Sequence, residues 1–328
     1  MTDLFAAAAR LDVTAVSEAI PASVRCALET PNAPQYDGDD VLVSLGPWTP
    51  RAPIRHFLPS LALLAARAPS VRFELAARRE GVWSPWIATT TLGDRTFARL
   101  PATADGLTAD IDEVFASPPV DGVRLRVRVG GPGCEAMFDT PWLVTLSAWD
   151  GTATGEGATP RVRLAVPPRT QMTEAEPIRL RICSPTSVGM AMEYLGREVP
   201  TVILAEEIFH APTDRYGVWP AAVRAAAAHG IPGYLLRFPD WQTVAWCLER
   251  GLPIVASVRY EPGELTNAAI ADTTGHLIVI TGLDGPDVLV NDPAAPTTRE
   301  VPRRYDRREL TRAWLDRSGV GYVFLRPL

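Results

Sequence analysis

The spacing of the hydrophobic residues changes near residue 160, and this change constrains the possible folds of the chain. Before it, apolar and polar residues alternate over short runs, as in DGVRLRVRV, where Val123, Leu125 and Val127 alternate with arginines. Strict alternation predicts strands with one buried face and one solvent-exposed face. After it, segments with helical spacing that end at a glycine are followed by apolar runs typical of strands. We therefore expect a multidomain chain whose two halves differ in architecture.

Four segments follow from these patterns. Residues 1–40 have no clear period, and the expectation is one helix over 2–20 followed by a loop rich in proline and aspartate. Residues 41–150 contain short strands separated by glycine, proline and aspartate, which predicts an all-β antiparallel sandwich. Residues 151–162 are mostly small and polar, as in a flexible linker. Residues 163–328 are expected to form an α+β domain with helices first and a mostly antiparallel sheet afterwards.

The composition excludes several classes of protein. A net charge of −6 argues against a nucleic-acid partner, which requires a clustered basic surface. The four cysteines have no CxxC spacing and the four histidines are scattered, so neither a disulfide framework nor a zinc site is expected. No metal or organic cofactor is predicted. The patterns do not determine the oligomeric state.

The N-terminus and the apolar runs bear on localisation. MTDLFAAAARLDVTAV carries acidic residues early and has no basic region before an unbroken apolar core, unlike a signal peptide. The most apolar run, FLPSLALLAARA, is too short to span a membrane. We therefore expect a cytoplasmic protein as the sequence is written, with export by another route left open.

Cys183 stands directly before Ser-Pro-Thr-Ser, where a helix is expected to begin because proline is favoured in a first helical turn. A thiol at this position interacts with the helix dipole and with unpaired first-turn N–H groups, which favour the thiolate. The same N–H groups can stabilise the oxyanion of an acyl-transfer intermediate. From spacing alone two interpretations stay open: a nucleophile, or a small apolar residue that fills the core.

A nucleophilic cysteine needs a general base, and the base needs an orienting group. His276 opens the apolar strand LIVITGL, and the chain then turns at residues 284–287 and returns as VLVNDP. Asp292 thus comes back toward the end of the hairpin that carries His276, and we predict that the two side chains are in contact. Each also has a simpler interpretation: His276 as a paired histidine at a strand end, and Asp292 as an Asx-turn residue before a proline.

Six blocks of the second half, in order, resemble a known family. They are CSPTSVGMAMEYLG, YGVWPAAVRAAAAHG, GLPIVASVRY, GELT, GHLIVITGLDG and VLVNDPAAP. Together they make residues 163–328 similar to the bacteriocin-processing-peptidase-like (double-glycine-peptidase-like) branch of papain-fold cysteine peptidases. The resemblance implies a papain-like α+β fold, a thiol protease activity and a peptide or protein substrate. The SPW and DGVRLRVRV segments also resemble a β-sandwich that precedes this domain in bacterial proteins.

The resemblance implies roles for individual residues. Cys183 corresponds to the nucleophile, His276 to the general base and Asp292 to its orienting group. Gln171, in PPRTQMT, corresponds to the side-chain donor of the oxyanion hole, with the backbone N–H of Cys183 as the second donor. Two features depart from the family pattern: Ile182 replaces an aromatic residue common in relatives, and the segment between Gln171 and Cys183 lacks the expected glycines.

The reaction implied is hydrolysis of a peptide or amide bond through a thioester. Two alternatives are kept. The same triad could transfer the acyl group to an amine, as a transpeptidase or acyltransferase does, or the domain could be a peptide-binding module without turnover. Neither the cleavage-site preference nor the role of the N-terminal half follows from the sequence.

Overall fold

The computed structural model describes residues 1–151, 153–155, 157 and 160–327. The chain divides into two compact units. One comprises Met1–Gly151 with Ala227–Leu235 and Pro327–Leu328, and the other comprises Thr152–Ala226 with Leu236–Arg326. The expected linker, 151–162, falls partly outside the described residues. Its last residue, Val162, already belongs to a strand.

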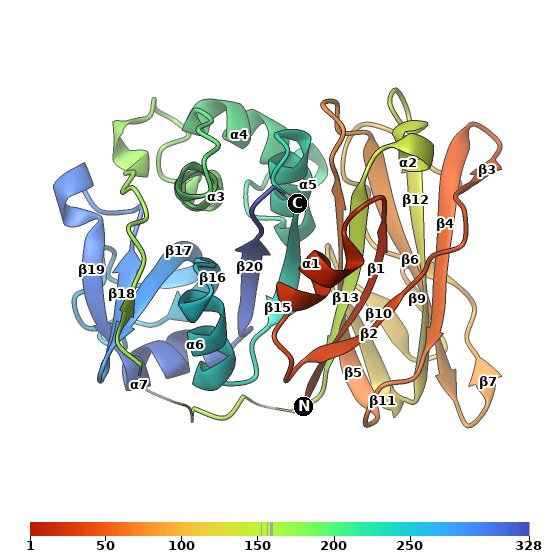
Figure 1. Ribbon diagram of the computed structural model, residues 1–328, viewed down its shortest axis with the longest axis horizontal. Coiled ribbons are helices and arrows are strands. Elements are labelled where there is room, and N and C mark those ends of the chain that lie inside the picture. Colours follow the sequence, from red (N-terminus) through yellow and green to blue (C-terminus); the bar gives the residue numbers. More distant parts are fainter. Residues whose placement is uncertain (152, 156, 158–159, 328) are drawn as a thin grey trace. The chain divides into compact units, whose positions relative to one another are not determined.

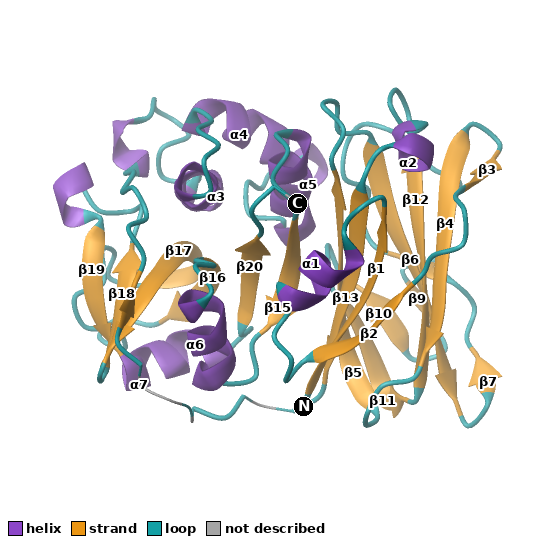
Figure 2. Cartoon of the chain, in the orientation of Figure 1, coloured by secondary structure: helices purple, strands orange, loops and turns teal. Residues whose placement is uncertain are grey.

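Figures 1 and 2 show the elements, whose bounds are as follows. The α-helices are α1 Val13–Glu18, α2 Ala136–Asp139, α3 Cys183–Tyr194, α4 Thr201–Ile208, α5 Trp219–Ala228, α6 Trp241–Glu249 and α7 Arg307–Leu310. Single turns of 3-10 helix cover Gln171–Thr173, Ala211–Thr213 and Thr298–Glu300, and a π-helical turn covers Thr311–Leu315. Strands of the first half are β1 Thr2–Ala9, β2 Arg25–Glu29, β3 Gln35–Asp37, β4 Asp40–Trp48, β5 Ile54–Leu63, β6 Ser70–Arg79, β7 Val82–Trp83, β8 Ile87–Ala88, β9 Thr103–Ala104, β10 Leu107–Ala109, β11 Val114–Val120, β12 Gly122–Gly130 and β13 Trp142–Trp149. Strands of the second half are β14 Val162–Arg163, β15 Gly233–Arg237, β16 Ile254–Tyr260, β17 Thr273–Asp284, β18 Asp287–Asn291, β19 Pro302–Asp306 and β20 Val320–Phe324.

The first half contains two sheets. One has the strand order β2-β1-β13-β5-β11-β10-β9, and the other has the order β3-β4-β12-β6-β7, with β8 also paired to β6. Two short helices, α1 and α2, accompany them, so this half is rich in strands without being purely β.

The helix expected over residues 2–20 is wrong for most of its length. Thr2–Ala9 forms β1, which pairs with β13 from Thr2 opposite Trp149 to Ala9 opposite Trp142. Only Val13–Glu18 is helical, with Asp12 as its N-cap. The run of alanines favours a helix by intrinsic propensity, but pairing and burial between neighbouring strands override it.

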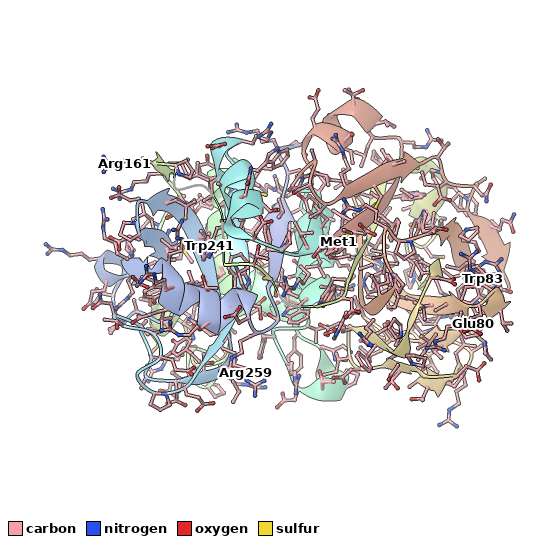
Figure 3. The ribbon with its side chains drawn as sticks, turned by 90° about the horizontal axis from the view of Figure 1, so that it is seen from below. Met1, Glu80, Trp83, Arg161, Trp241 and Arg259 are labelled. Atoms are coloured by element: carbon pink, nitrogen blue, oxygen red, sulfur yellow. The ribbon has the colours of Figure 1, made fainter. Side chains whose placement is uncertain are left out.

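Strand β12 follows the predicted alternation, with a difference on its polar face. Its valines and leucine are fully buried, as expected. The arginines on the other face are covered too: Arg124 stacks 3.9 Å above the ring of Trp83, and Arg126 stacks 4.0 Å above the ring of Trp86. Trp83 lies just beyond Glu80, which has φ +49° and begins the tight turn that joins β6 to β7 (Figure 3).

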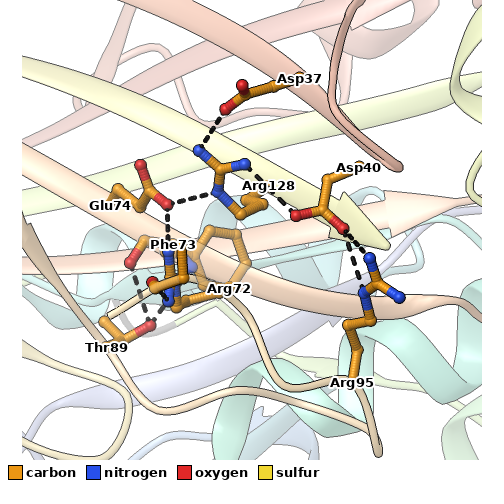
Figure 4. Close-up of polar contacts among 9 residues, drawn as sticks. Asp37, Asp40, Arg72, Phe73, Glu74, Thr89, Arg95 and Arg128 are labelled. Atoms are coloured by element: carbon orange, nitrogen blue, oxygen red, sulfur yellow. Dashed lines mark hydrogen bonds and ion pairs between the residues drawn. The ribbon is translucent and has the colours of Figure 1, made fainter. Parts of the chain in front are cut away.

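The third arginine of β12, Arg128, is buried in a network of charges (Figure 4). Its Nε lies 2.8 Å from Oε1 of Glu74, and its Nη2 lies 2.8 Å from Oδ2 of Asp37. Glu74, which is 1% exposed, also accepts from Nη2 of Arg72 at 2.6 Å. A buried charge is tolerated only when it is paired and hydrogen-bonded, as it is in this network.

The second half is a mixed α+β structure around a single sheet of order β15-β20-β16-β17-β18-β19, with β14 also paired to β17. Helix α3 packs against β16 and β17, and α6 packs against β14, β16 and β17. In Figure 1 these two helices lie on different sides of the β16–β17 strands. Helix α3 is almost entirely enclosed, with Ser184–Met192 buried.

Aspartate side chains cap the start of two helices in this half. Asp240 caps α6 by accepting the backbone N–H of Thr243 at 2.7 Å. Asp306 caps α7, accepting from the backbone N–H groups of Arg308 and Glu309. Within the described part of the chain, no helix has the length and apolar character needed to cross a membrane.

Candidate active site

Cys183 is the first residue of α3, at the end where the backbone N–H groups have no partner within the helix. Its side chain is half-buried. Pro185 occupies the third position, where its missing N–H costs no hydrogen bond, and the first backbone bond of this turn runs from the N–H of Thr186 to the carbonyl of Ile182 at 3.1 Å. The N–H of Cys183 therefore lies at the positive end of a buried helix, beside its own sulfur.

Three hydroxyls after Cys183 fix this helix end in place. Ser184 Oγ lies 3.3 Å from the hydroxyl of Tyr322 on β20, and Ser187 Oγ donates to the carbonyl of Leu277 on β17 at 3.0 Å. Thr186 Oγ1 donates to the carbonyl of Ile182 at 2.8 Å. All three are fully buried, so each polar group has the partner that burial requires. The bond from Ser187 matters most for the site, because Leu277 is the neighbour of His276.

His276 stands where β17 enters the core and is 3% exposed. The hairpin register pairs Val279 with Asn291, so one residue further along Asp292 comes opposite Ile278. The side chain of Ile278 points to the same face as that of His276, two residues earlier, which makes Asp292 and His276 diagonal neighbours. The distance from His276 Nε2 to Asp292 Oδ1 is 2.8 Å. The contact predicted from the hairpin is present.

The carboxylate of Asp292 is completely buried and accepts three hydrogen bonds. Oδ1 accepts from His276 Nε2 and from the backbone N–H of Ala294 at 3.0 Å. Oδ2 accepts from the hydroxyl of Tyr305 at 2.6 Å. The bond to Ala294 is the Asx-turn considered above, so Asp292 both forms the turn and contacts the histidine.

The electrostatics of these groups are coupled. Burial raises the pKa of the Cys183 thiol, but the hydrogen bond and charge of His276, with the N–H of Leu277, outweigh it and leave the pKa below its usual value. Burial lowers the pKa of His276, but the charge and hydrogen bond of Asp292 and the interaction with Cys183 raise it above its usual value. Burial raises the pKa of Asp292, while its three donors and the charge of His276 lower it overall. These directions favour a thiolate beside an imidazolium and an ionised carboxylate.

Gln171 is 4% exposed, and its backbone ties it to this group of residues. Its N–H donates to the carbonyl of Pro293, next to Asp292, at 2.9 Å. Its side-chain Nε2 donates to the carbonyl of Arg179 at 2.6 Å, while Oε1 is buried and has no protein partner. The bond to Arg179 fixes the orientation of the amide and leaves the second hydrogen of Nε2 for another acceptor.

The site contains one residue that the sequence patterns did not indicate. Tyr305 is fully buried on β19 and binds Asp292 directly. Its position opposite Val288 on β18 depends on the register of a third strand. The local pattern of residue types around Tyr305 gives no reason to place it near Asp292.

Among the residues that the structure describes, no three His, Cys, Asp or Glu side chains come together in an arrangement suited to a metal ion. The side chains described above supply a thiol, an imidazole, a buried carboxylate, a phenol and an amide.

Residues 163–322 match the family model described as Peptidase_C39 like family. Solved structures with some similarity include a C39-like peptidase from Bacillus anthracis, with 20% identity and a TM-score of 0.40, covering 51% of this chain and 98% of that one. A double glycine motif protease from an AMS/PCAT transporter, in complex with the leader peptide, has 17% identity and a TM-score of 0.35, covering 55% and 100%. The peptidase domain of Streptococcus ComA, a bi-functional ABC transporter involved in quorum sensing, has 15% identity and a TM-score of 0.35, covering 45% and 93%. No curated protein matches the chain.

Proposed function

We propose that Cys183, His276 and Asp292 are the catalytic triad of this protein. Residues 163–322 belong to the Peptidase_C39-like family, and this part of the chain is therefore a cysteine peptidase that acts on peptide substrates. The reaction proposed is hydrolysis of a peptide or amide bond through a thioester. The observation that carries the assignment is the buried 2.8 Å contact between His276 and Asp292, next to a cysteine whose pKa is lowered by the same histidine.

The steps of the proposed reaction follow from which ring nitrogen of His276 is free to take up and release a proton. His276 Nε2 faces Asp292, so Nδ1 is the ring nitrogen left to take the proton of the Cys183 thiol. The thiolate attacks the carbonyl carbon and forms a C–S bond. His276 then protonates the leaving amine as the C–N bond breaks. In the second half of the reaction His276 takes a proton from water, which attacks the thioester and releases the acid and the thiolate.

Gln171 is proposed as one donor to the oxyanion, and the backbone N–H of Cys183 as the other. Two features support this role: the Gln171 backbone is bonded to Pro293, and its side-chain nitrogen is held by the carbonyl of Arg179. Donors fixed in advance stabilise the developing charge without reorganisation during the reaction.

We also propose that the two sheets of residues 1–151 form a β-sandwich domain distinct from the peptidase domain. Its strands begin at Thr2, so the domain boundary lies earlier than residue 41.

Hydrolysis by the purified full chain tests the function, with a library of peptides of defined sequence as substrate and mass spectrometry of the products. Wild-type protein should cleave a subset of the peptides, and Cys183→Ala should cleave none while its Tm stays within a few degrees of wild type. The mutant Cys26→Ala is the control, since Cys26 is also half-buried but lies in the other unit. Cleavage that persists in Cys183→Ala would rule out the proposed nucleophile. Adding a free amine to the same assay distinguishes acyl transfer, which gives products with the amine attached, from hydrolysis.

A further inference from the structure

Tyr305 places a phenol against the innermost group of the site. The residue is fully buried on β19, where it pairs with Val288 of β18, and its hydroxyl lies 2.6 Å from Oδ2 of Asp292. A hydrogen bond between a hydroxyl and a carboxylate at this distance is short and charge-assisted, which places it among the stronger hydrogen bonds in proteins.

The two oxygens of Asp292 have separate partners. Oδ1 accepts from His276 and from the N–H of Ala294, while Oδ2 accepts from Tyr305. The donors on either side fix the rotation of the carboxylate, so that Oδ1 faces the imidazole. They also offset the cost of keeping an ionised carboxylate out of water.

We propose that Tyr305 is a positioning residue of the peptidase, which acts on His276 through Asp292 by holding the carboxylate ionised and rotated toward the imidazole. This inference rests on the proposed triad and extends it to a relay of four side chains from Cys183 on α3 to Tyr305 on β19.

Tyr305 is better suited to this role than the other titratable side chains near Asp292. Among the described residues, the titratable side chains that interact with Asp292 are Cys183, His276, Tyr260 and Tyr305. Tyr260, on β16, donates its hydroxyl to the carbonyl of Ile270 at 3.3 Å. Burial and the charge of Asp292 raise the pKa of Tyr305 far above neutral pH, so its hydroxyl stays protonated and remains a donor.

The test is Tyr305→Phe, which keeps the ring and removes the hydroxyl. Since Asp292 then loses its donor on Oδ2, it becomes protonated at a higher pH. We expect kcat to fall about tenfold with little change in KM, and the acid limb of the kcat/KM profile to move up by about one pH unit. The rate at which iodoacetamide alkylates Cys183 should shift along the pH axis in the same direction, and this readout requires no turnover.

Tyr234→Phe is the matched control. Tyr234 is also fully buried and donates its hydroxyl to a backbone carbonyl, that of Ala19 at 2.9 Å, but it lies on β15, at the opposite edge of the sheet from β19. Tyr234→Phe should lower Tm and leave the pH profiles of kcat/KM and of Cys183 alkylation unchanged. A purely structural role for Tyr305 would give this same pattern, and that result would overturn the proposal.

A second variant covers the case in which Tyr305→Phe folds poorly. Replacing Tyr305 by 3-fluorotyrosine keeps the hydrogen bond and makes the phenol a stronger donor, so the acid limb should move to lower pH. An unchanged limb with the fluorinated residue would equally contradict the proposal. If the wild-type chain cleaves no peptide, the alkylation profiles of Cys183 still decide the role of Tyr305, so the two proposals fail separately.

Discussion

The Nε2 atom of His276 lies 2.8 Å from Oδ1 of Asp292, and the same oxygen accepts the backbone N–H of Ala294. One carboxylate oxygen thus forms the turn that ends β18 and contacts the imidazole on β17. Oδ1 of Asp292 therefore links the backbone turn to the candidate active site. The Asx-turn that positions Pro293 and Ala294 also sets the position of the oxygen that accepts from His276. The same turn brings the carbonyl of Pro293 to the N–H of Gln171.

Replacing Asp292 by asparagine tests whether its charge or its position matters. An amide oxygen can still accept from Nε2, so we expect appreciable activity at neutral pH. The negative charge of Asp292 raises the pKa of His276, so its removal lowers that pKa, and the imidazolium loses its proton at a lower pH. The alkaline limb of kcat/KM should therefore move to lower pH.

The control for Asp292→Asn is Asp240→Asn, which makes the same change at the cap of α6, where asparagine caps equally well. Its pH profile should match wild type. Complete loss of activity in Asp292→Asn at every pH would show that the charge itself is indispensable, and an unmoved alkaline limb would show that Asp292 does not control the protonation of His276.

Gln171→Ala tests the oxyanion donor. Loss of one preorganised donor lowers kcat by about a hundredfold or more, and KM should change little, because the charge develops only in the transition state. Alkylation of Cys183 should proceed at the wild-type rate, since it involves no oxyanion. The exposed Gln242 on α6 gives the control Gln242→Ala, with kcat unchanged. An unchanged kcat in Gln171→Ala would assign the donor to another group.

Arg128→Leu tests the charge network in the first half. It removes the guanidinium that pairs with Glu74 and Asp37 and leaves Glu74, which is 1% exposed, with less compensation. Breaking such a buried pair costs about 3–5 kcal/mol of unfolding free energy. Arg124→Leu, on the same strand and face, removes mainly a stacking contact with Trp83 and should cost about 1 kcal/mol. Urea denaturation measures both, and equal losses would contradict a special role for the network.

The sequence was sufficient where a local signal decides the structure. The start of the helix at Cys183 depends on residues within one helical turn, and the hairpin turn at residues 284–287 brings Asp292 back to His276. These features need only neighbouring residues or a single strand pairing, which a pattern of residue types can indicate.

The structural features that local sequence patterns do not predict depend on several helices or strands at once. Thr2–Ala9 reads as a helix by its alanines, but it is held as a strand by pairing with β13, a partner more than 130 residues away. Tyr305 reaches Asp292 only because β19 pairs with β18 in one register, and a slip by one residue would turn it to the other face. No local period encodes that register.

The rate of alkylation of the four cysteines by iodoacetamide at mildly acidic pH, with each modified site located by peptide mapping, tests the central assignment most directly. Burial raises the pKa of Cys26 to about 11 and also raises the pKa values of Cys134 and Cys247, whereas His276 lowers that of Cys183. Cys183 should react first and almost alone, and Cys26, although half-buried like Cys183, should stay unmodified. A Cys183 that reacts no faster than Cys26 would contradict the presence of a thiolate paired with His276.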